Sequence, residues 1–162
     1  MLIRKACGYD AASIAEISVV TWKKTYEGLI DQSILDAREV TSKRISQWEQ
    51  RILHPNDTIV YVAEENSKIL GYLWGGIGRD ERFSEKMEIY ALYVLPDCQK
   101  KGIGSLLVQA FKSYVSQEDF YAFVLSGNPS ERFYLKIGCR KDERFKMDGE
   151  LIEYPFIFSF RG

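Results

Sequence analysis

The sequence of 162 residues is poor in the residue types that build several common active sites. It has one histidine, His54, and three cysteines, Cys7, Cys98 and Cys139, with no C-x-x-C pair. A histidine triad or a histidine-rich metal site would depend on His54 alone, and its place before Pro55 is typical of the surface end of a helix. We therefore expect no metal site, and we expect three reduced thiols of a cytoplasmic protein.

The chain also lacks an excess of charge and a long apolar run. Its 22 Lys and Arg residues face 23 Asp and Glu residues, so the formal net charge is −1. A nucleic-acid or anionic-membrane partner would require a basic face, so neither partner is expected. No stretch approaches the roughly 18 apolar residues of a membrane span. The opening residues have no signal-peptide core, which again favours a cytoplasmic location.

The apolar content predicts a folded protein. Hydrophobic residues make up 46% and aromatic residues 14% of the chain, and this length fits a single domain of residues 1–162. Residue periodicity predicts strands at 2–5, 58–63, 68–76, 87–95, 120–126, 139–147 and 151–160, and helices at about 10–26, 42–53, 103–117 and 131–136. This order predicts an α/β fold with a mixed, mostly antiparallel sheet and helices on both faces.

The most informative stretch is residues 87–108. A continuous apolar strand stops at Pro96, a basic loop with two glycines follows, and a helix begins after it. The free N–H groups of a first helical turn favour an anion, and Gly102 and Gly104 let that anion approach the backbone. We interpret residues 99–105 (the 99–105 loop) as a phosphate or pyrophosphate site, with a simple tight turn as the alternative.

Two nucleotide-binding motifs are excluded at this loop. The P-loop requires G-x-x-x-x-G-K-[ST], which the sequence around Gly102 does not supply. The dinucleotide fingerprint requires a third glycine, and Leu107 stands in its place.

Three segments resemble the GNAT acetyltransferase superfamily. LYVLPDCQKKGIGSLL (92–107) resembles the acetyl-CoA motif [QR]-x-x-G-x-[GA]. SGNPSERFYLKIGC (126–139) resembles the second family motif, and IRKACGYDAASIAEI (3–17) resembles the opening strand and helix. The resemblance implies a GNAT-like mixed, mostly antiparallel sheet of about seven strands, splayed apart at strands four and five.

The same resemblance implies acyl transfer from acetyl-CoA, used as a co-substrate, to the primary amine of a small molecule or peptide. The pantetheine arm would lie in the gap between strands four and five. The implied CoA-binding residues come from the end of strand four, the 99–105 loop and the second motif: Leu92, Tyr93, Val94, Gln99, Lys100, Lys101, Gly102, Ile103, Gly104, Ser105, Asn128 and Tyr134.

Transfer of this kind needs a proton donor for the thiolate and a base for the amine. The resemblance makes Tyr134 the expected acid, with packing against cofactor or core as the alternative. Glu88 is the expected base, with a surface carboxylate as the alternative. Glu88 would share a strand face with Val94 if no bulge lies between them.

The acceptor pocket is expected to involve Trp22, Tyr26, the loop 78–85 and the final strands with Glu150 and Glu153. Aromatic and acidic side chains suit a cationic amine, although core packing is the usual role of tryptophan and solvated surface the usual role of such charges. Two alternative functions stay open: a non-catalytic acyl-CoA-binding module, and transfer of a longer acyl chain. An exposed edge among the final strands is a candidate contact for a homodimer.

Overall fold

A computed structural model describes residues 1–161, so the last residue of the expected 1–162 domain lies outside the described residues. Within residues 1–161 the helices are α1 Ala11–Tyr26, α2 Gln32–Ala37, α3 Ser42–Leu53, α4 Ile103–Val115 and α5 Ser130–Lys136. The strands are β1 Leu2–Lys5, β2 Thr58–Glu65, β3 Lys68–Ile77, β4 Met87–Val94, β5 Phe120–Leu125, β6 Arg140–Lys141, β7 Lys146–Asp148 and β8 Leu151–Phe158. None of these helices is long and apolar enough to cross a membrane.

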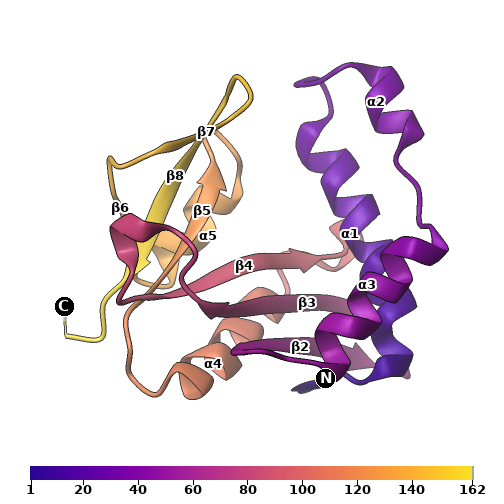
Figure 1. The fold of residues 1–162 in the computed structure, drawn as a ribbon, viewed down its shortest axis with the longest axis horizontal. Coiled ribbons are helices and arrows are strands. Elements are labelled where there is room, and N and C mark those ends of the chain that lie inside the picture. Colours follow the sequence, from indigo (N-terminus) through magenta and orange to yellow (C-terminus); the bar gives the residue numbers. More distant parts are fainter. Residues whose placement is uncertain (162) are drawn as a thin grey trace.

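The strands form one eight-stranded sheet in the order β1-β2-β3-β4-β5-β8-β6, with β7 also paired to β8 (Figure 1). Every pairing is antiparallel except β4 with β5. That parallel pairing covers only Met87 with Phe120 and Glu88 with Tyr121. Beyond these two pairs the strands diverge, which confirms the predicted mixed sheet and its splay at strands four and five.

Two apolar layers cover the two faces of the sheet. On one face, α4 buries Leu107 and Phe111 against β3, β4, β5 and β8. On the other, α1 and α3 bury Ile14 and Trp48 against β2 and β3. The prediction of helices on both faces is therefore confirmed, and the divergence of β4 and β5 opens the sheet between the layers.

The prediction of one continuous strand at 139–147 is wrong. The chain forms β6, leaves the ladder, and returns as β7. Asp142 explains the break, because its carboxylate accepts hydrogen bonds from the backbone N–H of Arg144 at 2.9 Å and from its Nε at 2.8 Å. This local turn replaces ladder hydrogen bonds. Asp148-Gly149, a residue pair typical of tight hairpin turns, joins β7 to β8, with Gly149 at φ +62°.

A β-bulge in β4 changes which side chains share a face. Trp74 pairs with Ala91 but Gly75 pairs with Ile89, so Tyr90 is an extra residue in the strand. Ile89 packs in the α4 layer, as Val94 does, whereas Ala91 packs in the α1 layer. An inserted residue reverses the alternation of a strand. The expectation that Glu88 and Val94 share a face required an uninterrupted strand, and this bulge contradicts it.

Candidate active site

The divergence of β4 from β5 encloses a cavity of about 310 Å³. Its walls come from α1, the outer half of β4, β5, the start of α5 and β8. The lining residues are Thr21, Lys24, Thr25, Tyr26, Ile89, Tyr90, Ala91, Leu92, Tyr93, Val94, Pro96, Gln99, Ala122, Phe123, Val124, Leu125, Asn128, Ser130, Tyr134 and Glu153. The cavity therefore touches both the α4 side and the α1 side of the sheet.

The 99–105 loop lies beside this cavity and leads into α4. Lys100 at φ +64° and Gly102 at φ +83° both adopt left-handed backbone conformations. Turns of this kind orient successive N–H groups toward a common point, which suits an anion. Gly102 precedes the first turn of α4. Because Gly102 has no side chain, it does not occupy the free N–H groups of that turn. The geometry thus fits the phosphate site inferred from the sequence.

Two further features determine the positions of this loop and of the helix that follows it. The Gln99 Nε2 group donates a 3.0 Å hydrogen bond to the carbonyl oxygen of Val94, which ties the loop back to the end of β4. A Cβ atom on Gly104 would lie 3.1 Å from Cε1 of Phe133. The absence of a side chain at Gly104 therefore lets α5 pack closely against the start of α4.

Tyr134 is held by the start of α5. Asn128 Oδ1 accepts a 2.9 Å hydrogen bond from the Ser130 N–H, and Glu131 Oε1 accepts a 2.7 Å bond from the Gly127 N–H. These two bonds hold the turn that precedes α5, whose N-cap residue is Pro129. Tyr134 is 6% exposed and lines the cavity. Burial raises the pKa of Tyr134 well above its usual range, so the phenol keeps its proton at neutral pH.

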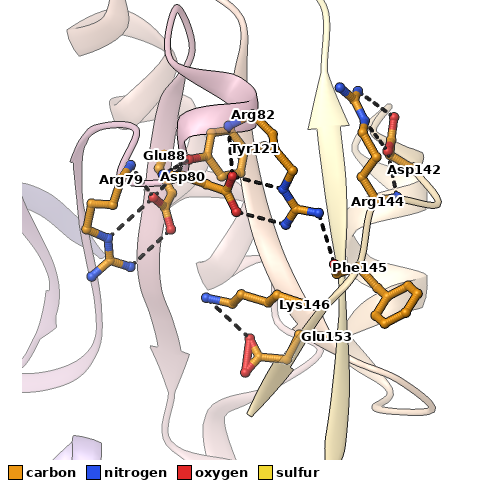
Figure 2. Close-up of polar contacts among 10 residues, drawn as sticks. All are labelled: Arg79, Asp80, Arg82, Glu88, Tyr121, Asp142, Arg144, Phe145, Lys146 and Glu153. Carbon is orange, nitrogen blue, oxygen red and sulfur yellow. Dashed lines mark hydrogen bonds and ion pairs between the residues drawn. The ribbon is translucent and has the colours of Figure 1, made fainter.

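Glu88 lies outside the cavity lining, in a buried ion pair at the closed end of the β4–β5 gap (Figure 2). Its side chain is 3% exposed. Its carboxylate accepts hydrogen bonds from Arg79 N at 2.9 Å, Nε at 3.3 Å and Nη2 at 3.0 Å, and from the Tyr121 hydroxyl at 3.1 Å. These four donors give Glu88 the surroundings of a structural anchor for the loop that carries Arg79.

Glu153 is the acidic side chain that lines the cavity within residues 1–161. It lies on β8 opposite Leu125 of β5 and opposite Lys146 of β7. Lys146 Nζ is 3.9 Å from its Oε2, and the side chain is 17% exposed. Burial raises the pKa of Glu153, Lys146 opposes the rise, and the charge of Asp148 adds to it.

The aromatic residues predicted for the acceptor pocket separate into two groups. Tyr26 lines the cavity, and burial followed by the charge of Glu153 raises its pKa to about 12. Trp22 packs against Tyr26, with ring centroids 5.2 Å apart. The Cζ atom of Arg38 lies 4.1 Å from the centroid of the Trp22 ring. Trp22 therefore supports a wall of the cavity without lining it.

The cavity brings together many of the residues predicted from the sequence. It includes Leu92, Tyr93, Val94, Gln99, Asn128, Tyr134 and Tyr26, while Lys100, Lys101, Gly102, Ile103, Gly104 and Ser105 form the adjoining loop and helix start. The loop 78–85 and Glu150 do not line it. Sequence reasoning missed Arg79 as the partner of Glu88, and no pattern in the sequence links these two residues.

Comparisons with known proteins agree with this geometry. The profile described as the acetyltransferase (GNAT) family matches residues 22–139. The uncharacterized N-acetyltransferase YuaI of Bacillus subtilis (strain 168) is 29% identical over 136 residues, which cover 82% of this chain and 76% of YuaI.

Two solved structures have the same fold. PaiA N-acetyltransferase from Thermoplasma acidophilum, solved with coenzyme A, gives a TM-score of 0.78 at 20% identity and covers 98% of both chains. The protein yncA from Salmonella typhimurium, solved with its cofactor acetyl-CoA, gives a TM-score of 0.69 at 25% identity. The match covers 98% of this chain and 93% of the yncA chain. The family profile spans most of the sequence and both of its motifs, and the chain belongs to the acetyltransferase (GNAT) family.

Proposed function

We propose that this protein is an acetyl-CoA-dependent N-acetyltransferase that moves an acetyl group to a primary amine of a small molecule or peptide. Direct attack of the amine in a ternary complex is the proposed route. The observation that carries the proposal is the pairing of β4 with β5 at two positions, beyond which the strands enclose a cavity that Tyr134 lines. Relatives named as N-acetyltransferases support it.

The proposed place of acetyl-CoA follows from the backbone. Its pyrophosphate would accept hydrogen bonds from the N–H groups of the 99–105 loop and the first turn of α4, where the helix dipole also favours an anion. Lys100 and Lys101 would add positive charge. The pantetheine arm would lie between the diverging strands beside Leu92, Tyr93, Val94 and Asn128.

Tyr134 is the proposed acid of the reaction. The amine nitrogen bonds to the thioester carbonyl carbon, and the C–S bond of the tetrahedral intermediate then breaks. The Tyr134 hydroxyl donates its proton to the leaving sulfur, and the phenolate recovers a proton lost from nitrogen. Burial keeps the phenol protonated at neutral pH but also makes it a weaker acid, so the proposed role depends on the place of Tyr134 in the cavity lining.

An acceptor screen with acetyl-CoA, read as release of free CoA, tests the proposal. Release that requires both the enzyme and a primary amine supports it. Binding of CoA without turnover over a broad amine panel would instead indicate a non-catalytic acyl-CoA-binding module. A higher kcat/KM with succinyl-CoA than with acetyl-CoA would indicate a transferase for a longer acyl chain.

A further inference from the structure

We propose that Glu153 is the residue that binds the acceptor amine as its ammonium ion and takes the proton that must leave before attack. This inference rests on the proposed function and gives the base a different identity from Glu88. It concerns the α1 side of the cavity, opposite the buried Tyr134.

The position of Glu153 is the first argument. In the β5–β8 ladder Glu153 pairs with Leu125, and in the β4–β5 ladder Glu88 pairs with Tyr121. Four residues of β5 separate these two levels, which corresponds to roughly 13 Å along a strand. Glu88 is therefore at the closed end of the gap, whereas Glu153 lies beside its open part, where the two strands no longer touch.

The second argument is the availability of the two carboxylates. Glu88 accepts four hydrogen bonds from Arg79 and Tyr121. Within residues 1–161 the carboxylate of Glu153 has one charged partner, Lys146 at 3.9 Å, and accepts no hydrogen bond. A general base needs a free lone pair within reach of the proton it removes, and Glu153 meets this requirement.

The third argument is the surroundings of Glu153. Tyr26 of α1 and Tyr93 of β4 line the same cavity, and the charge of Glu153 contributes to the raised pKa of both. Lys146 and Asp148 of β7 and Glu88 of β4 are the other charged groups that act on it. A carboxylate among aromatic faces is a suitable site for an alkylammonium ion. Figure 2 shows Lys146 and Glu153 directed toward one another from neighbouring strands.

The proton balance follows from these positions. Glu153 takes one proton from the bound ammonium ion, which leaves a neutral amine to attack the thioester carbon. The second proton leaves nitrogen as the C–S bond breaks and compensates the proton that Tyr134 gives to sulfur. One proton per turnover then passes from Glu153 to solvent. Burial raises the pKa of Glu153 toward neutral pH, where a base is most effective.

The test uses Glu153→Gln, with Glu143→Gln as the matched control because Glu143 is an exposed acid outside the cavity. We expect Glu153→Gln to lower kcat/KM for the amine by about 100-fold or more and to remove the acidic limb of the pH profile. The affinity for CoA, measured by calorimetry, should stay at the wild-type value in both variants.

A second variant keeps the test decisive if Glu153→Gln is unstable. Lys146→Met removes the charge that lowers the pKa of Glu153, so the acidic limb should move to higher pH. Lys136→Met, an exposed lysine on α5, should leave the limb in place. A merely structural role for Glu153 would not move the limb.

The outcomes separate this inference from the proposed function. Turnover by the wild type with an unchanged pH profile in Glu153→Gln overturns the inference alone. A wild type that binds CoA but releases none from acetyl-CoA overturns the proposed function. Binding of 1,4-diaminobutane to the CoA complex then decides the inference: loss of binding in Glu153→Gln supports an ammonium site, and equal binding overturns it. A wild type that does not bind CoA overturns both.

Discussion

The hydroxyl of Tyr121 donates a 3.1 Å hydrogen bond to Oε1 of Glu88, across the last residue pair that joins β5 to β4. The same hydroxyl accepts a 3.2 Å bond from the Asp80 N–H, and Arg79 pairs with the Glu88 carboxylate. One buried carboxylate therefore connects two strands and the loop above them. This arrangement fixes the position along β4 and β5 at which the two strands begin to diverge.

Removal of Arg79 should weaken the fold. Arg79→Met leaves the Glu88 carboxylate buried without its cation, and we expect the free energy of unfolding to fall by about 2 kcal/mol. This is less than the roughly 3–5 kcal/mol of a fully buried pair, because Arg79 is half exposed. Urea unfolding measures the change. Arg82→Met is the control, since it breaks a more accessible pair with Asp80 and should cost under about 1 kcal/mol. Equal losses would contradict the anchoring role.

Loss of the Tyr134 hydroxyl should slow turnover without weakening the fold. We expect Tyr134→Phe to lower kcat by about 100-fold, in the range of general acid catalysis, while the melting temperature and the affinity for CoA stay unchanged. Tyr61→Phe is the control, because Tyr61 is partly buried on β2 and does not line the cavity. Near-normal turnover of a folded Tyr134→Phe protein would refute the acid role.

Gly102 should be required for CoA binding through its backbone conformation. An alanine at φ +83° is strained by about 1–2 kcal/mol, so Gly102→Ala should raise the Kd for CoA about tenfold as the loop relaxes. Gly28 is a close match, with φ +80° and no atom within 4 Å of an added Cβ. Gly28→Ala should cost similar stability and leave the Kd unchanged. A similar rise in Kd for both variants would show that general strain, and not the loop, controls binding.

Asp142 should make stability depend on acid. Its hydrogen bonds with the Arg144 side chain hold the pKa of Asp142 well below its usual range. A group with a lowered folded pKa stabilises the fold above its unfolded pKa of about 3.9 and loses this contribution as pH falls further. Asp142→Asn should therefore reduce the free energy of unfolding at pH 7, and the difference from wild type should shrink below about pH 4. Urea unfolding at pH 7 and pH 3 measures it, and a constant difference would contradict the prediction.

The sequence was most informative where a local rule determines the backbone. Pro96 follows the end of β4 and Asp148-Gly149 forms the β7–β8 turn, and each is visible from one or two residues. The GNAT resemblance supplied the splay between β4 and β5, which no local pattern encodes. The short helix α2 is absent from the helices predicted from the sequence.

The sequence was least informative where the register of strand pairing determines which side chains share a face of the sheet. The bulge at Tyr90 depends on how β3 pairs with β4, and this one inserted residue moved Glu88 away from the face expected for it. Glu153 lies in the cavity because β8 returns beside β5 in one register. Neither pairing can be derived from the spacing of residues along the chain. The expected pocket contained Glu153, but its special position among the acidic residues emerged only from the tertiary structure.

The brief pairing of β4 with β5 also affects how the protein opens. Within residues 1–161, the strands β1–β4 share two ladder pairs with the strands β5, β8, β6 and β7, so side-chain contacts, chiefly those of the α4-side core, carry most of the coupling between these halves. A ligand that fills the gap between β4 and β5 would add contacts to both halves of the sheet. Amide hydrogens in β5 and β8 should then exchange with solvent faster than those in β2 and β3 in the free protein, and the difference should narrow in the CoA complex. Cooperativity across the sheet would in this way be a property of the complex more than of the chain.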